Sequence, residues 1–283
     1  MTIQQARNWV QQSQALVITA GAGMGVDAGL PDFRGSAGLW RAFPALRERG
    51  MALEDIATPH WFDEDPALAW GFYGHRLLSY RAARPHAGHQ VLRRWCAARP
   101  HHIITSNVDG LFQQAEWEDR AIWEMHGTIQ RWQCSTPCSD QRWPARLEEL
   151  SLDPHSGLAK HWPLCPHCGA VARPNLMMFG DAFWISDDMA AAEQAFRAFI
   201  DQHRGPGLLV IEVGAGTTIP TMRNMGEWLM LEYEARLLRI NPADDADQGD
   251  WHPRLCTIRQ GAATALPALA ADGHIASVPE SSF

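Results

Sequence analysis

The sequence predicts an α/β protein in which helices cover both faces of a parallel β-sheet, extended by a helical insertion and a small cysteine-held module. Short apolar runs, typical of strands buried on both faces, recur along the chain and are separated by helix-length segments. Residues 36–95 carry helical patterns rich in Trp, Phe, His and Arg. Residues 131–172 hold two close cysteine pairs and little periodicity. These two stretches interrupt the alternation, so we expect them to be additions to the sheet.

The predicted strands begin with Ala15–Thr19, an apolar run that ends at a glycine-rich turn. The other runs span residues 102–105, 122–125, 208–213, 236–240 and about 255–258. A helix is expected from Ser186 to His203, where apolar side chains recur on one face. The expected domains are a sheet domain of residues 1–130 and 173–272 with the insertion at about 36–95, the cysteine module at 131–172, and a polar tail at 273–283.

Composition excludes several classes of protein. The chain has 283 residues, of which 46% are hydrophobic and 20% charged, enough for a sizeable core and unlike a disordered chain. A net charge of −8 argues against a nucleic-acid partner, which would call for basic residues. No run approaches the roughly 18–20 apolar residues that cross a bilayer, and no signal peptide is evident. We therefore expect a cytoplasmic protein without a membrane partner.

The segment Gly21-Ala22-Gly23 follows the first predicted strand. Glycines in such a turn let the backbone approach a pyrophosphate, although a tight turn of any α/β protein has the same pattern. The string Gly29-Leu30-Pro31-Asp32-Phe33-Arg34-Gly35 comes next. It places a carboxylate, an aromatic ring and a guanidinium on one loop, which indicates a loop that lies over a bound cofactor.

Polar side chains also follow the next two strands. Thr105-Ser106-Asn107-Val108-Asp109 sits at a strand end, where ligands of open α/β sheets bind. An amide and a carboxylate there suit an amide-bearing ring or a ribose, while turn capping is the alternative. His126 precedes a glycine after the following strand. Its imidazole is the side chain best suited to take a proton from a sugar hydroxyl near neutral pH.

The cysteines form a C-x₃-C pair, Cys134 and Cys138, and a C-x₂-C pair, Cys165 and Cys168. Four thiolates suit tetrahedral zinc, and because no coordination position stays open, the site is expected to be structural. In a chain without an evident export signal, metal ligation is favoured over disulfides.

Together these strings resemble the bacterial-type members of the sirtuin (Sir2) family of NAD-dependent protein-lysine deacylases. The resemblance covers about residues 15–270. The matching strings, in the family's order, are Gly21–Gly23, Gly29–Gly35, Asn107–Asp109, His126-Gly127, the two cysteine pairs, Arg173-Pro174 and Phe179-Gly180. The implied fold is a Rossmann-type doubly wound parallel sheet with helices on both faces, plus a small zinc-binding module and a helical insertion.

The resemblance also implies the chemistry. NAD as co-substrate and an acylated lysine peptide or protein bind in the cleft between the parts, and zinc is structural. The acyl oxygen attacks the nicotinamide ribose, nicotinamide leaves, and His126 deprotonates a ribose hydroxyl that takes over the acyl group. Free lysine and O-acyl-ADP-ribose are the products. Asn107 and Asp109 are implied to hold the carboxamide, Phe33 to shield the intermediate, and Phe179-Gly180 to pair with the substrate backbone.

The resemblance also implies which residues form the site. The catalytic residues are His126 and Asn107. The NAD-binding residues are Gly21, Ala22, Gly23, Asp32, Phe33, Arg34, Ser106, Asn107, Asp109, Gly214, Gly216, Thr217, Asn241 and Ala262. The residues implied to contact the acyl group or the peptide are Tyr73, Arg76, Leu176, Met177, Phe179 and Gly180.

Some positions depart from the family pattern. Gly25 stands in place of a serine, Ser106 in place of a glutamine, and Asp181 in place of a glutamate. The family's valine pair beside the acyl tunnel is Leu176-Met177 here. These changes concern acyl preference and turnover more than NAD binding.

Tyr73 and Arg76 resemble the Tyr-x-x-Arg pattern of members that remove acidic acyl groups such as succinyl or malonyl. The alternative for this pair is an aromatic residue and an arginine on a surface helix. For the whole chain, an NAD-consuming ADP-ribosyltransferase or NAD hydrolase on the same fold is one alternative. A non-catalytic NAD-sensing module is the other.

Overall fold

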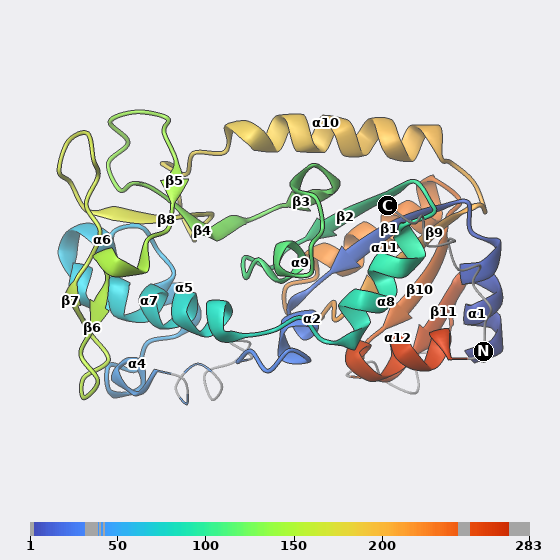
Figure 1. Cartoon of the computed structure of the whole chain (residues 1–283), viewed down its shortest axis with the longest axis horizontal. Coiled ribbons are helices and arrows are strands. Elements are labelled where there is room, and N and C mark those ends of the chain that lie inside the picture. Colours follow the sequence, from blue (N-terminus) through green and yellow to red (C-terminus); the bar gives the residue numbers. More distant parts are fainter. Residues whose placement is uncertain (1–2, 32–38, 40, 42, 243–249, 272–283) are drawn as a thin grey trace, which may run out of the picture.

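In the computed structural model, which describes residues 3–31, 39, 41, 43–242 and 250–271, a six-stranded sheet forms one end of an elongated molecule (Figure 1). The strand order is β11-β10-β9-β1-β2-β3, and all neighbouring strands are parallel. The bounds are β1 Ala15–Ala20, β2 His101–Thr105, β3 Ile122–Glu124, β9 Leu208–Val213, β10 Arg236–Ile240 and β11 Leu255–Ile258. The predicted fold class and the predicted strands are confirmed. The strand order reverses between β1 and β9, and ligands of doubly wound sheets bind at the carboxyl ends of the strands there.

Helices cover both faces of this sheet because its strands are apolar on both sides. In β1, Leu16 and Ile18 face a core with α1, α8 and α12, whereas Ala15 and Val17 face a core with α10 and α11. The helix predicted from Ser186 to His203 is α10. The bounds of the helices are α1 Ile3–Gln12, α8 Ala87–Cys96, α10 Asp187–Gln202, α11 Thr221–Glu232 and α12 Ala262–Ala270.

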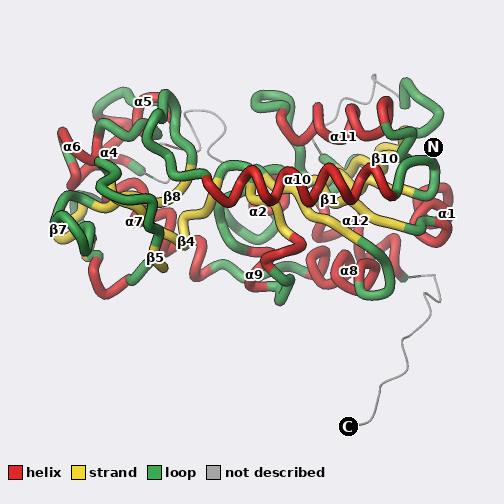
Figure 2. Tube along the Cα trace, turned by 90° about the horizontal axis from the view of Figure 1, so that it is seen from above, coloured by secondary structure: helices red, strands yellow, loops and turns green. Residues whose placement is uncertain are grey.

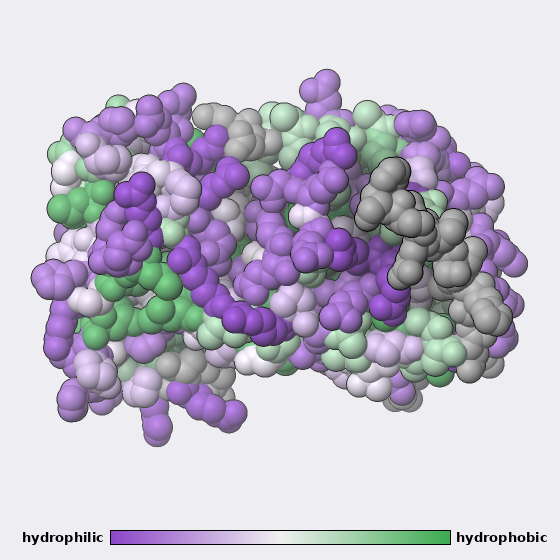
Figure 3. Space-filling model, viewed as in Figure 1, coloured by the Kyte–Doolittle hydropathy of each residue, from purple (hydrophilic) through white to green (hydrophobic). Residues whose placement is uncertain are grey.

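A second lobe lies at the other end of the molecule, where short helices pack against antiparallel strands (Figure 2). One sheet has the order β5-β4-β8, and β6 pairs with β7. The strands are β4 Gly127–Cys134, β5 Trp143–Pro144, β6 Ser151–Leu152, β7 Ala159–His161 and β8 Ala172–Leu176. The helices of the lobe are α4 Pro44–Glu48, α5 Leu53–Ile56, α6 Trp61–Glu64, α7 Pro66–Ala82 and the 3₁₀ turn η2 Leu147–Glu149. Over α7 and β6, hydrophobic side chains gather on the face shown in Figure 3.

The longest helix of the second lobe, α7, begins with a sequence suited to a helix start. The Asp65 side chain accepts a hydrogen bond from the Leu68 amide, and Pro66 occupies the first turn. Tyr73 is fully buried in the lobe's core, whereas Leu78 on the same helix is exposed.

The range 36–95, predicted as a helical insertion, contains helices of both lobes. Helices α4–α7 pack in the second lobe, while α8 adds Val91, Leu92 and Trp95 to the core on the sheet. The remaining short elements are α2 Ala22–Val26, α9 Leu111–Gln114 and the 3₁₀ turn η1 Asp119–Ala121, which contacts β2 and β3. In the part of the chain that the structure describes, no helix combines the length and apolar character needed to cross a membrane.

Candidate functional site

A cavity of about 440 Å³ brings together many of the predicted site residues. Its walls come from α2, the ends of β2 and β8, the β3–β4 connection and α7. The predicted residues that line it are Ala22, Tyr73, Arg76, Ser106, Asn107, Asp109, His126, Leu176, Met177 and Phe179. Residues that are distant in the sequence therefore meet at the carboxyl edge of the sheet, next to the second lobe.

Gly21, Gly23 and Gly214 lie where the loops after β1 and β9 touch backbone to backbone. A Cβ at Gly21 would come within 2.6 Å of the Gly214 oxygen, and one at Gly23 within 2.6 Å of the Gly214 Cα. Gly214 has a φ of +60°, a conformation that favours glycine. The contact between the two loops therefore requires these glycines, which the sequence interpretation had assigned to the approach of a pyrophosphate.

Asn107 ties the end of β2 to this glycine turn. Its side-chain nitrogen donates to the Gly21 carbonyl at 3.0 Å, and its backbone N–H donates to Thr105 Oγ1 at 3.0 Å. The neighbouring Ser106 lines the cavity with a shorter side chain than the family's glutamine. The amide of Asn107 is thus held in a fixed position at the cavity wall.

Asp109 places a carboxyl group in a nearly dry environment. It is only 6% exposed, and burial raises its pKa to about 6, against the opposing effects of the Leu111 amide and the Arg76 charge. Its Oδ1 accepts the Leu111 N–H at 2.9 Å. A Cβ at Gly25 would lie 3.2 Å from Asp109 Oδ2, so the glycine found here in place of serine leaves room for the carboxyl group.

His126 lies in the connection between β3 and β4, at the junction of the two lobes. Burial lowers the pKa of its imidazole, and a hydrogen bond with the Ser106 backbone opposes this shift in part. The ring is therefore neutral at neutral pH and able to accept a proton. Its carbonyl accepts the Met177 N–H at 2.9 Å, which fixes the end of β8 beside it.

Tyr73 and Arg76 project from α7, one turn apart, into the same cavity. The Tyr73 hydroxyl is buried and has no hydrogen-bond partner among the described residues, and burial raises its pKa to about 12. The Arg76 guanidinium lies 5.6 Å from the centre of the Tyr73 ring. A neutral phenol and a cation thus face the space between α7 and the end of β8.

Met177 and Phe179 follow β8 and remain 45% and 44% exposed, which is high for apolar side chains. The N–H groups of both residues are already engaged, with the carbonyls of His126 and Ala57 respectively. A substrate backbone adding to this segment would therefore have to pair with its carbonyl oxygens.

Some predicted residues do not line the cavity. Gly216 and Thr217 lie further along the loop after β9, and Gly180 follows Phe179 at the rim. The Asn241 side chain donates to the Ala215 carbonyl at 2.8 Å, and Ala262 is buried in the core on the sheet. Asp32, Phe33 and Arg34 lie outside the described residues.

Other lining residues were missed by the sequence interpretation. They are Leu53, Ala57, Tyr80, Met178, Ile219 and Thr221, whereas Gly25, Leu30, Pro31 and Val108 also line the cavity and lie at positions or in strings already singled out from the sequence. Tyr80 had a usable signal, because it stands one helical turn after Arg76. The residues from α5 and from the loop before α11 had none, since only the folded chain brings them to this cavity.

The four paired cysteines meet in the second lobe, beyond the end of β4. Their sulfur atoms all lie within 4.8 Å of one another, and the Cys134–Cys168 and Cys138–Cys165 sulfurs are both 3.6 Å apart. Tetrahedral zinc with bonds of about 2.3 Å to sulfur places its thiolates about 3.8 Å apart. The cluster therefore fits a zinc ion closed to further ligands, as predicted. Cys96 and Cys256 are buried elsewhere.

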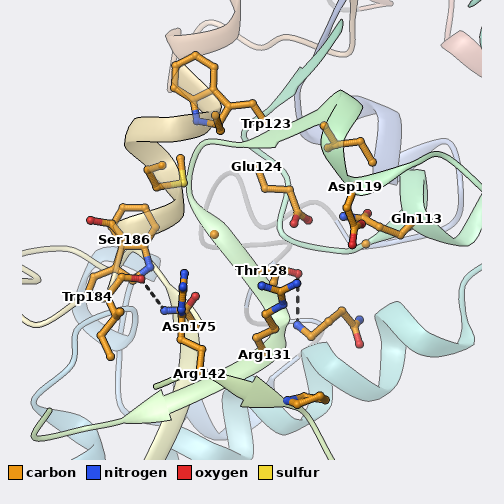
Figure 4. A pocket seen from close by; sticks show the side chains of 18 of the residues that line it. Gln113, Asp119, Trp123, Glu124, Thr128, Arg131, Arg142, Asn175, Trp184 and Ser186 are labelled. Atoms are coloured by element: carbon orange, nitrogen blue, oxygen red, sulfur yellow. Dashed lines mark hydrogen bonds between the residues drawn. The ribbon is translucent and has the colours of Figure 1, made fainter. Parts of the chain in front are cut away.

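A larger cavity of about 850 Å³ lies on the other side of the β3–β4 connection, and none of the predicted site residues lines it. Figure 4 shows Glu124 pointing into it from the end of β3, with Thr128 and Arg131 of β4 on the facing wall. Burial raises the pKa of Glu124 to about 7. Because the predicted chemistry gathers in the smaller cavity, that cavity is the candidate site.

Comparison with known proteins identifies the family. The Sir2 family model matches residues 21–199. An NAD-dependent protein deacylase of Aeropyrum pernix is 34% identical over 238 residues, covering 84% of this chain and 84% of that protein. NAD-dependent protein deacylase 1 of Pseudomonas aeruginosa is 31% identical over 261 residues, covering 91% of this chain and 93% of that protein.

A solved structure of Sir2 with a p53 peptide and NAD⁺ superposes with a TM-score of 0.71 at 19% identity, covering 98% of this chain and 100% of that one. At this identity the likeness shows a shared fold. Fold and cavity thus define a Rossmann-type α/β protein with a cavity at the carboxyl edge of its sheet. The chain belongs to the Sir2 family.

Proposed function

We propose that the protein is an NAD-dependent protein-lysine deacylase that transfers the acyl group of a modified lysine to ADP-ribose and releases nicotinamide. The observation that carries this proposal is one cavity that holds a neutral imidazole, His126, together with Asn107 and Asp109. Membership of the Sir2 family and the deacylase names of relatives that match most of the chain support it.

In this proposal each side chain has one task. His126 takes a proton from a ribose hydroxyl, since its lowered pKa keeps it unprotonated at neutral pH. Asn107 and Asp109 hold the carboxamide of the nicotinamide ring, and the loops around Gly21 and Gly214 border the phosphates. The carbonyl oxygens of Met177 and Phe179 pair with the backbone of the peptide.

Zinc is proposed to be structural. The four cysteines would hold it through their thiolates and leave no position for substrate. Its contribution is to fix the segment that leads into β8, and with it the wall of the cavity that carries Leu176 and Met177.

The acyl class that we propose is acidic, such as succinyl or malonyl. Arg76 supplies a cation at the wall of the cavity, and the Tyr73 hydroxyl has no partner among the described residues. A terminal carboxylate would satisfy both, with charge-assisted hydrogen bonds that an acetyl group cannot form.

The test is mass spectrometry of the products formed from NAD and a panel of acetyl- and succinyl-lysine peptides. O-acyl-ADP-ribose in equal amount with nicotinamide is expected. Nicotinamide release without a peptide would instead indicate an NAD hydrolase. ADP-ribose attached to the peptide would indicate an ADP-ribosyltransferase. Saturable NAD binding without any product would indicate a sensing module.

The same assay tests His126. A His126→Ala variant should lose at least about 100-fold in turnover, in line with the usual contribution of a general base. Its affinity for NAD and its unfolding temperature should stay close to wild type. His203→Ala, at the end of α10, is the control and should keep full activity.

The remaining proposals concern setting and organisation. We propose that the chain works in the cytoplasm, where thiolates stay reduced, and that its partners are acylated proteins and neither nucleic acids nor membranes. The proposed domains are 1–130 with 173–272, and 131–172. The proposed tail, 273–283, lies outside the described residues.

A further inference from the structure

We propose that Tyr80 is a positioning residue that orients Arg76 toward the acyl group and thereby sets the preference for acidic acyl chains. This inference rests on the proposed deacylase function and on the acidic acyl class. It assigns a task to a residue that the sequence interpretation did not include.

The contact between Tyr80 and Arg76 is direct. Arg76 Nε donates a hydrogen bond to the Tyr80 hydroxyl at 3.0 Å. The same guanidinium lies 5.3 Å from the Phe72 ring centre and 5.5 Å from that of Tyr80, within the range of cation–π attraction. Tyr80 is only 5% exposed. One phenol and several ring faces therefore surround the arginine side chain.

The backbone holds Tyr80 itself in place. It stands near the end of α7, one turn beyond Arg76, and its carbonyl accepts the Gln114 side-chain N–H at 3.1 Å. The phenol is part of the second lobe's core and also lines the cavity. Its hydroxyl therefore stands at a defined point relative to the cavity wall.

An arginine side chain has many rotamers, so binding a carboxylate normally costs conformational entropy. A hydrogen bond from Nε to Tyr80 removes part of that cost before the ligand arrives. It also selects the geometry: with Nε engaged, a carboxylate would have to meet the guanidinium at its terminal nitrogens. That end-on pairing is the orientation we assign to Arg76 in the substrate complex.

The consequence for specificity is selective. An acidic acyl group needs the guanidinium in this orientation, whereas an acetyl group has no charge to offer it. Loss of the Tyr80 hydroxyl should therefore weaken only the binding of acidic substrates. A purely structural role of Tyr80 would instead affect all substrates alike.

The experiment compares the full-length wild type with Tyr80→Phe, which keeps the ring and removes the hydroxyl. Turnover is measured with NAD and with acetyl- and succinyl-lysine peptides of one sequence. We expect KM for the succinyl peptide to rise about three- to tenfold, as for the loss of one hydrogen bond, with kcat nearly unchanged. Both constants for the acetyl peptide should stay within about twofold.

Tyr233→Phe is the matched control, because Tyr233 packs on Trp228 near the end of α11, away from the cavity. It should leave the ratio of succinyl to acetyl activity unchanged. Calorimetric binding of the succinyl peptide to each variant is a second readout that does not need turnover.

Equal losses on both peptides in Tyr80→Phe, or no change on either, would overturn the role of Tyr80. A wild type that removes acetyl groups but neither binds nor removes succinyl groups would also overturn it, while leaving the deacylase function intact. If no peptide were turned over, the deacylase function would fail. The calorimetric comparison would then still decide whether Tyr80 orients Arg76.

Discussion

At the scale of single residues, Asp109 illustrates the energetic cost of burying a carboxyl group. Its buried carboxyl has a pKa of about 6, against the ordinary value of 3.8 for an aspartate side chain. Because the pKa of Asp109 is raised in the folded state, the folded protein binds a proton at this carboxyl more tightly than the unfolded chain does. The contribution of this group to the free energy of unfolding is therefore highest below about pH 4, and it falls as the pH rises to about 6.

Asp109→Asn should stabilise the fold at pH 7.5. The neutral amide can still accept the Leu111 N–H and carries no buried charge, so we expect a gain of up to about 3 kcal/mol, at about 1.4 kcal/mol for each pKa unit. Urea unfolding at pH 7.5 and pH 5 measures this gain in the free energy of unfolding, and the gain should be smaller at pH 5. Asp119→Asn, at an exposed position near this region, is the control. A less stable Asp109→Asn protein at pH 7.5 would contradict the interpretation.

The residues of the site were predictable to different degrees. His126, Asn107 and Asp109 were identified because they follow strands, and parallel strands end at one edge of a sheet. Tyr73 and Arg76 were identified by their resemblance to the Tyr-x-x-Arg pattern of the family, and that pattern could not show that Tyr73 is buried. Ile219 escaped prediction because it belongs to a loop without regular structure and reaches the cavity only through tertiary packing.

At the scale of elements, the segment after β8 owes its shape to a buried ion pair. The side chains of Arg173 and Asp181 are both fully buried. Asp181 accepts two hydrogen bonds from the Arg173 guanidinium, and it also accepts the Met178 N–H at 3.2 Å and the Phe183 N–H at 3.1 Å. The pair thus closes a loop around Phe179, which lines the cavity.

Asp181→Asn should destabilise this loop and weaken peptide binding. The amide cannot neutralise Arg173, and an unpaired buried charge costs roughly 3–5 kcal/mol. We expect a lower free energy of unfolding and a higher KM for the acylated peptide. Urea unfolding and steady-state kinetics measure the two effects.

Glu193→Gln is the control, because it removes an exposed partner of Arg197 on α10 and should change neither quantity. Wild-type stability in Asp181→Asn would show that Arg173 finds another partner.

The elements themselves were predictable where burial is uniform. The six strands of the sheet were located because strands buried on both faces read as continuous apolar runs. Helices α4–α6 are only four or five residues long, too short for the apolar pattern of a helix to repeat. Strand β4, Gly127–Cys134, spans residue 131, where the cysteine module is proposed to begin.

At the scale of the whole molecule, the candidate cavity belongs to neither lobe alone. Sheet loops supply Asn107 and Asp109, while α7 and β8 supply Tyr73, Arg76 and Leu176. The sequence could name these residues but could not show how the lobes meet, because no local pattern encodes the contact. The cysteine cluster joins the end of β4, a strand that begins directly after His126, to the segment before β8, a strand that ends at the cavity with Leu176. Loss of the metal should therefore affect the site from a distance.

Cys138→Ser should abolish zinc binding and lower the unfolding temperature. Metal binding contributes directly to folding free energy, and each kcal/mol lost shifts the midpoint of a protein of this size by roughly 2–4 °C, so we expect a decrease on the order of 10 °C. The zinc content measured by elemental analysis should fall from one ion per chain to near zero, and the deacylation rate should fall with it. Cys256→Ala, at a buried thiol of β11 outside the cluster, should keep one zinc per chain and full activity. A zinc-free Cys138→Ser protein with wild-type stability and turnover would show that the thiolate cluster does not support the site.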